Sequence, residues 1–251
     1  MAGAGHAIAA AGRAAHDAVL PRRAALARGR WPVVVAIAGL VGFLGIFGLV
    51  RANRSQAFDV AITLRLQRRR HPWLDRLMAI ASWPGFPPQS RVIPPAAIGG
   101  LWVLRFRTEA AFLAAGWGTG ALSTLLKAAM DRPRPIAGTD LRVVVAPLGG
   151  SSFPSGHVIT YVGTYGFLAY LADTLPRDPV VRRTAAGGLV AMVLLVGPSR
   201  IYQGHHWPTD VSASYLLGTT YLIALILGYR AVKEREGLRG DLAAVVDEAR
   251  R

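Results

Sequence analysis

The stretch Trp31–Val50 reads WPVVVAIAGLVGFLGIFGLV and carries no charged side chain along its whole length. About 20 apolar residues in a helix span the hydrocarbon core of a bilayer. A cleavable signal peptide has a shorter apolar core of roughly 7–15 residues, followed by a small-residue cleavage site. This run instead continues to Leu49-Val50 and meets Arg51 directly. It therefore predicts a retained membrane helix.

Further apolar runs alternate with short charged or proline-containing joints along the rest of the chain. They cover residues 88–104, 108–126, 158–172, 184–198 and 211–229. The first of them is the weakest, because Pro94-Pro95 interrupts it. Together with Trp31–Val50, these runs predict an all-α fold class, a six-transmembrane helical bundle with both chain ends on the same side of the membrane.

Residues 51–90 have a different pattern. Apolar residues alternate from Phe58 to Leu66 and an arginine block follows. An isolated strand beside a bilayer would leave its edges unpaired, and His71-Pro72 and Trp83-Pro84-Gly85 break the segment. We expect amphipathic interfacial helices here, between the first and second spans, with their arginines at headgroup level. A soluble loop is the alternative interpretation.

The composition supports a membrane protein over a soluble basic one. Hydrophobic residues make up 52% of the chain and charged residues only 17%, with a mean hydropathy of +0.34, whereas soluble domains contain about 25% charged residues. The net charge of +15 then fits anionic lipid headgroups better than nucleic acid. Cysteine is absent from the sequence, which excludes disulfides and thiolate metal sites.

The chain shows no repeat and no low-complexity linker, so one membrane domain is expected. We predict that residues 31–229 form the six-span domain, that residues 1–30 form an N-terminal cytoplasmic extension, and that residues 230–251 form a charged C-terminal tail. Basic residues are slightly more numerous on the side that would hold both ends of the chain. The positive-inside rule therefore favours cytoplasmic termini.

Polar clusters stand at the ends of several predicted spans. KAAMDRPRP (Lys127–Pro135) leaves the third span, SSFPSGHV (Ser151–Val158) enters the fourth, and SRIYQGHHWPTD (Ser199–Asp210) joins the fifth to the sixth. With six spans, all of these clusters lie on the same face of the membrane. We therefore expect them to converge on one site.

The residue types in the polar clusters indicate an anion site. Lys127, Arg134 and Arg200 would repel one another in a small volume unless an anion lay between them, and guanidinium groups match phosphate oxygens with paired hydrogen bonds. Ser155 is a natural N-cap for the fourth span. Gly156 lets backbone N–H groups approach a ligand at the helix N-terminus, which favours anions.

The third cluster adds a carboxylate beside a histidine. Pro208 suits the first position of the sixth helix, and Asp210 at the third position can reach back toward the residues before the helix. That arrangement brings Asp210 near a histidine ring. The carboxylates near the clusters are few, namely Asp131, Asp140 and Asp210. With three cations beside them, no metal ion is expected.

Together, the clusters resemble the signature of the type 2 phosphatidic acid phosphatase family. That signature is K-x6-R-P, then P-S-G-H, then S-R-x5-H-x3-D, and all its positions are present in order between Lys127 and Asp210. The lead-in PWLDRLMAIASWPG (Pro72–Gly85) is also similar to the family. Residues 1–30 and the tail from residue 230 have no such support.

The resemblance implies a metal-independent hydrolase that works through a phosphohistidine, without a cofactor. His206 would be the nucleophile, Asp210 would orient its ring, and His157 would protonate the leaving oxygen. The phosphoryl oxygens would be held by Lys127, Arg134, Ser155, the Gly156 backbone and Arg200. His205 stands one position too early for the spacing to Asp210, and we expect it to line the site or the interface.

The resemblance also implies a lipid phosphate monoester or diphosphate as substrate, within a bacterial plasma membrane and with the active face toward the periplasm or exterior. Undecaprenyl diphosphate is favoured, with phosphatidic acid and phosphatidylglycerol phosphate as alternatives. The soluble acid phosphatases and vanadium-dependent haloperoxidases of the wider superfamily do not fit a chain made mostly of membrane spans. A non-enzymatic lipid-phosphate binder or transporter is the other class, but it would need only the cations and not the complete set of His157, His206 and Asp210.

Overall fold

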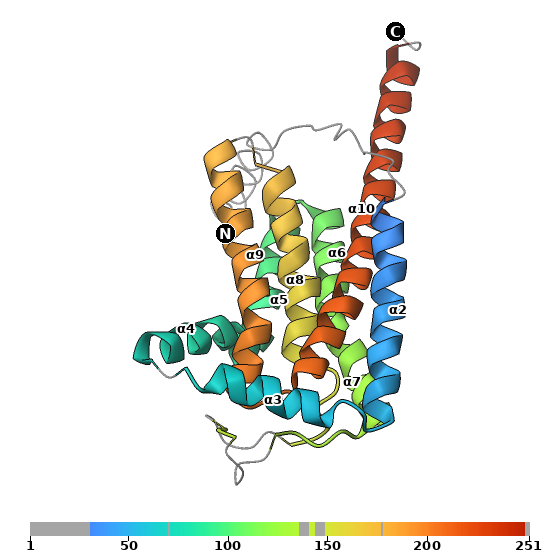
Figure 1. Cartoon of the computed structure of the whole chain (residues 1–251). Coiled ribbons are helices and arrows are strands. Elements are labelled where there is room, and N and C mark those ends of the chain that lie inside the picture. The colour runs from blue at the N-terminus through green and yellow to red at the C-terminus, as the bar shows by residue number, and fades with distance from the viewer. Residues whose placement is uncertain (1–30, 70, 136–140, 144–148, 177, 249–251) are drawn as a thin grey trace.

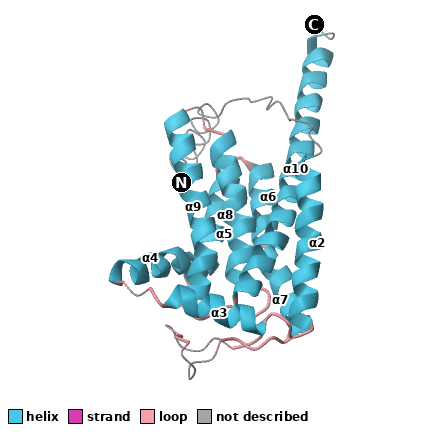
Figure 2. Cartoon of the chain, in the orientation of Figure 1, coloured by secondary structure: helices cyan, strands magenta, loops and turns pink. Residues whose placement is uncertain are grey.

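The computed structural model describes residues 31–248 except 70, 136–140, 144–148 and 177, and in this part of the chain every regular element is helical (Figures 1 and 2). The elements are α2 (Trp31–Arg51), α3 (Gln56–Gln67), α4 (Pro72–Ser82), the 3-10 turn η1 (Trp83–Gly85), α5 (Gln89–Val103), α6 (Arg107–Trp117), α7 (Thr119–Met130), α8 (Gly156–Thr174), α9 (Pro179–Tyr202) and α10 (Pro208–Glu248). The predicted all-α class is confirmed. The predicted extension over residues 1–30 lies outside the described residues.

Three described helices are long and apolar enough to cross a membrane, namely α2, α9 and the Pro208–Glu236 part of α10. The predicted number of six spans is not confirmed. Helix α5 has only 15 residues and contains Pro94 and Pro95. Helix α8 lies in the middle of the bundle, packed against α6, α7, α9 and α10 (Figure 1). A helix enclosed by protein does not face lipid, so it need not be uniformly apolar.

The predicted span over residues 108–126 forms two helices, α6 and α7, which meet at Gly118. Thr119 Oγ1 donates a hydrogen bond to the Gly116 carbonyl at 2.7 Å. The backbones of Gly116 and Gly163 of α8 pack so closely that a Cβ on either would meet the carbonyl oxygen of the other. Small residues permit this approach between helices. The joint therefore fixes α7 against the first half of α8.

Helices α9 and α10 are both longer than the apolar runs that predicted them. Helix α9 starts at Pro179 rather than near residue 184, because Asp178 caps it by accepting hydrogen bonds from the N–H groups of Val180 (2.7 Å) and Val181 (3.0 Å). Helix α10 continues without interruption to Glu248 and projects beyond the other helices (Figure 1). The part of the predicted charged tail that the structure describes, up to Glu248, is helical.

Helix α3 runs across one end of the bundle, and α4 packs against α9 and projects to one side (Figure 1). The prediction of short helices between the first two spans is confirmed, and the loop interpretation of this segment is wrong. Helix α3 buries a polar stripe, Asp59, Thr63 and Gln67, with a spacing of four residues. Residues at this spacing share one helix face, so α3 turns its polar side toward the protein.

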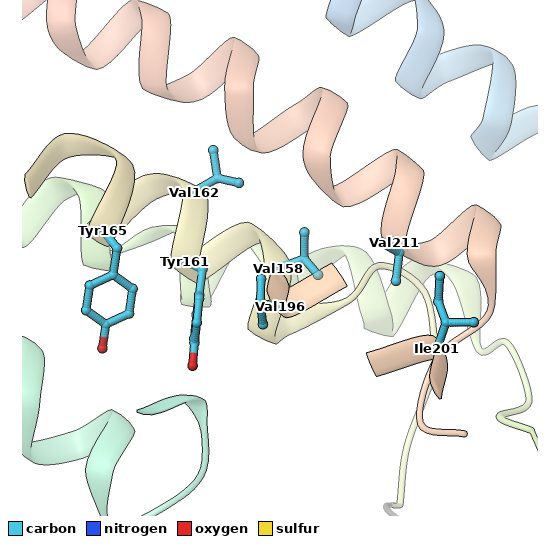
Figure 3. Packing of buried hydrophobic residues seen from close by; sticks show 7 residues of the cluster. All are labelled: Val158, Tyr161, Val162, Tyr165, Val196, Ile201 and Val211. Atoms are coloured by element: carbon cyan, nitrogen blue, oxygen red, sulfur yellow. The ribbon is translucent and has the colours of Figure 1, made fainter. Parts of the chain in front are cut away.

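A hydrophobic cluster holds α8, α9 and α10 together just above that end of the bundle. Its buried members, shown in Figure 3, are Val158, Tyr161, Val162, Tyr165, Val196, Ile201 and Val211. The cluster packs the start of α8 against the end of α9 and the start of α10. Those are the helix ends that carry the second and third polar clusters.

Candidate active site

The polar clusters meet at the end of the bundle where α3 crosses it. Arg134 links the first cluster to the third, because its Nη1 donates to the His205 carbonyl at 2.7 Å and lies 3.3 Å from His206 Nε2. Lys127 Nζ donates to the Ser151 carbonyl at 3.1 Å and so links α7 to the second cluster. The structure thus brings the clusters together, as predicted.

His206 is almost fully buried in the loop between α9 and α10, with a defined ring orientation. Its Nδ1 lies 2.8 Å from the Ser152 carbonyl oxygen. A carbonyl can only accept, so Nδ1 carries the hydrogen and Nε2 presents a lone pair. Burial, followed by the positive charges of Arg134, Arg200 and Lys127, holds the pKa of His206 well below its ordinary value. The ring is therefore a neutral imidazole whose basic Nε2 accepts from Arg134 on the cationic side.

Asp210 is near His206, as predicted, but the contact between the two is secondary. Its Oδ2 lies 3.7 Å from His206 Nδ1, and the same oxygen accepts from the Trp207 N–H at 2.9 Å. The direct partner of the ring is the Ser152 carbonyl. The sequence could not indicate this acceptor, since a backbone carbonyl has no residue signature.

Arg132 is the main partner of Asp210, and sequence reasoning missed it. Its Nη1 donates to Asp210 Oδ1 at 2.5 Å, and its Nη2 donates to Asp59 Oδ2 at 2.6 Å. Thr209 completes the arrangement by donating through both its N–H and its hydroxyl to Asp59, each at 2.9 Å. The two carboxylates are fully buried and Arg132 nearly so. The polar stripe on α3 was the one signal in the sequence that could have indicated Asp59.

Ser155 and Gly156 open helix α8, as predicted. Ser155 is the N-cap residue, yet its side chain makes no capping hydrogen bond, and within the described residues its buried Oγ has no partner. Its own N–H donates to Ser214 Oγ at 2.7 Å. A Cβ on Gly156 would lie 3.3 Å from Ser123 Oγ and 4.0 Å from Lys127 Cε. The helix start therefore faces Lys127 closely.

His157 stands in the first turn of α8, and its buried Nε2 lacks a hydrogen-bond partner in the described part of the chain. It borders a cavity of about 510 Å³ that also touches Lys127 and Gly156. Buried polar atoms in folded proteins are nearly always satisfied. The free Nε2 therefore indicates a place where a ligand atom belongs.

Arg200 is completely buried at the end of α9. Its Nη1 donates to Gln203 Oε1 at 3.1 Å, its Nη2 contacts His205 Nδ1, and its guanidinium lies 4.8 Å from the centre of the Phe86 ring. His205 was expected to line the site or the interface. It is buried and partners Arg200, so it supports one of the cations.

The positive charge at the site is concentrated on one side of His206. Arg134 has its pKa lowered by burial, an effect that Asp210 partly opposes. Within the described residues, no group of three or more His, Asp or Glu side chains is arranged to hold a metal ion. The donor set is that of an anion site.

The fold and the site together define a class, a helical membrane-type protein with a buried histidine set among cations. Comparison with known proteins identifies the family within that class. The model of the PAP2 superfamily matches residues 109–234. The phosphatidylglycerophosphatase B of Bacillus subtilis (strain 168) is 30% identical over 193 residues, which cover 74% of this chain and 90% of that protein. The chain belongs to the PAP2 superfamily.

Another relative and two solved structures are similar over 45% to 80% of this chain. Undecaprenyl-diphosphatase BcrC of Bacillus subtilis (strain 168) is 32% identical over 114 residues, covering 45% of this chain and 51% of that protein. Among solved structures, the transmembrane PAP2-type phosphatidylglycerolphosphate phosphatase from Bacillus subtilis superposes with a TM-score of 0.67 at 25% identity, covering 80% of this chain and 96% of that one. Aquifex aeolicus LpxE shares the fold, with a TM-score of 0.54 at 24% identity, over 67% of this chain and 94% of that one.

Proposed function

We propose that this chain is an integral membrane phosphatase that hydrolyses a lipid phosphate monoester or diphosphate through a phosphohistidine. The observation that carries the proposal is the orientation of His206. Its Nδ1 is bound to the Ser152 carbonyl at 2.8 Å, and its Nε2 faces Arg134 at 3.3 Å. A neutral imidazole nitrogen that points at a cationic anion site is a nucleophile placed against phosphorus.

In the first step His206 Nε2 attacks the terminal phosphorus, and the bond from that phosphorus to the leaving oxygen breaks. The leaving oxygen belongs to the lipid alcohol of a monoester or to the lipid monophosphate of a diphosphate. His157 gives its proton to that leaving oxygen. Lys127, Arg134 and Arg200, with Ser155 Oγ and the N–H groups at the start of α8, hold the phosphoryl oxygens. Such a reaction depends mainly on positioning and on charge stabilisation of the equatorial oxygens.

In the second step His157, now neutral, takes a proton from water, and the resulting hydroxide oxygen attacks phosphorus. The bond from phosphorus to His206 breaks, and inorganic phosphate leaves. As His206 becomes positively charged in the first step, the Asp210 carboxylate 3.7 Å from its Nδ1 stabilises that charge. Both histidines return to their starting protonation states, so no cofactor is consumed.

For the substrate we favour undecaprenyl diphosphate, because a compact six-span enzyme with an external active face suits recycling of a polyprenyl carrier, and the similarity to undecaprenyl-diphosphatase BcrC supports this choice. Phosphatidylglycerol phosphate is the second candidate, supported by the longer match to phosphatidylglycerophosphatase B; phosphatidic acid is the remaining one. The test is phosphate release by the purified chain in detergent from a panel of these lipids. A chain that binds the lipids without releasing phosphate would be a binder or transporter instead.

Metal independence belongs to the same proposal, because three cationic side chains stand where other phosphatases use Mg²⁺. Excess EDTA should change turnover by less than about twofold. Loss of turnover on chelation, restored by added Mg²⁺, would contradict the mechanism.

We further propose that residues 31–229 cross the bacterial plasma membrane six times, with residues 1–30 and 230–251 in the cytoplasm and the active face toward the periplasm or exterior. The sequence contains no cysteine, so single cysteines can be labelled without background. Gly149 is exposed near the site, and Arg183 is exposed at the opposite end of α9. An impermeant thiol reagent on intact cells should label Gly149→Cys and spare Arg183→Cys. The reverse pattern would overturn the orientation.

A further inference from the structure

We propose that Gly85 and Phe86 are positioning residues that hold the His157 imidazole in line with the leaving oxygen. The inference rests on the proposed function. Neither residue belongs to the three polar clusters, and both precede residues 109–234, the region matched by the family model. Gly85 ends the η1 turn and Phe86 follows it, between helices α4 and α5.

Gly85 lies directly against the His157 ring. A Cβ built on Gly85 would lie 2.8 Å from Nε2 of His157 and closer still to its Cδ2. Real Cβ atoms do not approach other heavy atoms so closely, and packed protein has little room to absorb such an overlap. Glycine at this position is therefore what allows the imidazole to occupy its place at the cavity wall.

Phe86, the next residue, also packs against the ring. Its ring meets His157 edge-on, with centroids 4.9 Å apart, and meets His205 in the same manner at 6.1 Å. The Arg200 guanidinium lies 4.8 Å from the centre of the Phe86 ring. Phe86 thus contacts both the proton donor and a fully buried cation through favourable aromatic geometry.

The turn that carries these residues is tied to the rest of the site. Ser82 Oγ lies 2.5 Å from Ser199 Oγ, which joins the start of η1 to the residue before Arg200. The Tyr161 hydroxyl donates to the Ala81 carbonyl at 3.1 Å, and this bond joins the same segment to α8. The wall against His157 is therefore held from both α8 and α9.

Packing has a special role at His157 because Nε2 has no hydrogen-bond partner in the described structure. The ring of His206, in contrast, is oriented by the Ser152 carbonyl. A ring whose Nε2 is left free for the leaving group takes its orientation from its neighbours. Gly85 and Phe86 are two of those neighbours, so changes in them should affect protonation of the leaving oxygen more than attack on phosphorus.

The test compares two leaving groups on the purified full chain in detergent. A short-chain phosphatidic acid has an alkoxide leaving group that needs a proton, whereas 4-nitrophenyl phosphate has one that does not. General acid catalysis contributes about 10²–10⁴-fold. Gly85→Ala should lower turnover of the alkyl substrate by at least about tenfold and that of the aryl substrate by less than about threefold. Gly99→Ala, at an exposed position of α5 with open space around it, should leave both unchanged.

A double-mutant cycle shows whether Gly85 acts through His157, since residues that act together give non-additive effects. In a His157→Ala background, Gly85→Ala should cause no further loss on either substrate. Equal loss on both substrates, or full additivity with His157→Ala, would overturn the inference while wild-type turnover still supports the phosphatase. If the wild-type chain releases no phosphate, the proposed function fails and the inference fails with it. If Gly85→Ala does not fold, Phe86→Leu takes its place, because it keeps most of the side-chain volume. It should show the same larger loss on the alkyl substrate and the same lack of further loss in the His157→Ala background.

Discussion

The two sides of the His206 ring differ in how completely their polar groups are hydrogen-bonded. On the Nδ1 side, the polar groups are paired with one another through short hydrogen bonds. On the Nε2 side, several buried polar groups have no partner within the described residues. These atoms are Ser123 Oγ, Ser155 Oγ, His157 Nε2 and Arg200 Nε.

The paired side is a closed network. Arg132 bridges the buried carboxylates of Asp59 and Asp210, Thr209 donates twice to Asp59, and the Trp207 N–H donates to Asp210. Removing one member would leave a buried charge without compensation, which is costly. This side is therefore a support that holds the ring, and it ties α3 to the start of α10.

The unpaired side has the character of a binding site. Native proteins rarely leave buried polar groups unsatisfied, and two of these groups, on Ser123 and His157, belong to residues that line the cavity beside Lys127. The comparison shows how to tell the two sides of His206 apart. Polar groups that are all paired mark the side that supports the ring, and polar groups without partners mark the side where we propose that the substrate binds.

The largest effect is expected from removing the ring that divides the two sides. His206→Ala should lower turnover at least about 10⁴-fold, since no other nucleophile lies in its place. His205→Ala is the matched control, because it removes the neighbouring buried histidine. It should cost about tenfold, the value of one hydrogen bond to the charged Arg200. The measurement is phosphate release, together with acid-labile label on the protein. An inactive His205→Ala with an active His206→Ala would show that the nucleophile is misassigned.

The paired side should show its role in stability. Arg132→Gln leaves Asp59 and Asp210 buried without their shared cation, and breaking a buried ion pair in this way costs about 3–5 kcal/mol. Arg132→Lys keeps the charge but cannot form two forked contacts, so it should fall between. Chemical denaturation in detergent micelles measures the free energy of unfolding. An unchanged free energy of unfolding in Arg132→Gln would show that the paired side does not support the fold.

The unpaired side was largely predictable from the sequence and the paired side was not. Lys127, Arg134, His157 and His206 belong to short motifs, and the chemistry of each residue type indicates an anion site. The contact of Arg132 with Asp59 joins residues 73 positions apart, and no local pattern encodes it. The α6–α7 joint was missed for a similar reason, because it depends on Gly163 of a different helix.

A smaller effect is expected from Asp210→Asn, and it tests what each acceptor on the Nδ1 side contributes. In the serine proteases the corresponding amide replacement costs about 10⁴-fold, because the histidine adopts the wrong tautomer. Here the Ser152 carbonyl accepts from Nδ1 at 2.8 Å and keeps the tautomer. Asp210→Asn should therefore weaken the ion pair with Arg132 but, at the ring itself, lose the charge stabilisation and not the tautomer, about 10²-fold in turnover with little change in KM. A loss of about 10⁴-fold would mean that Asp210, and not Ser152, orients the ring.

The smallest effect concerns acid pH, and it follows from the charge on the unpaired side. Burial and the cations Arg134, Arg200 and Lys127 hold the pKa of His206 well below its ordinary value, which is about 6.5 for a free histidine. A depressed pKa means that the ring gains its proton only when the pH falls through that lower value, so the nucleophile stays neutral across mildly acidic pH. The NMR signal of the ¹⁵N-labelled imidazole that is missing from His206→Ala should keep its neutral position from pH 7.5 down to about 5.5. Titration of that signal at or above about 6.5 would show that the cations do not act on Nε2, and the contrast between the two sides of the ring would then lose its electrostatic basis.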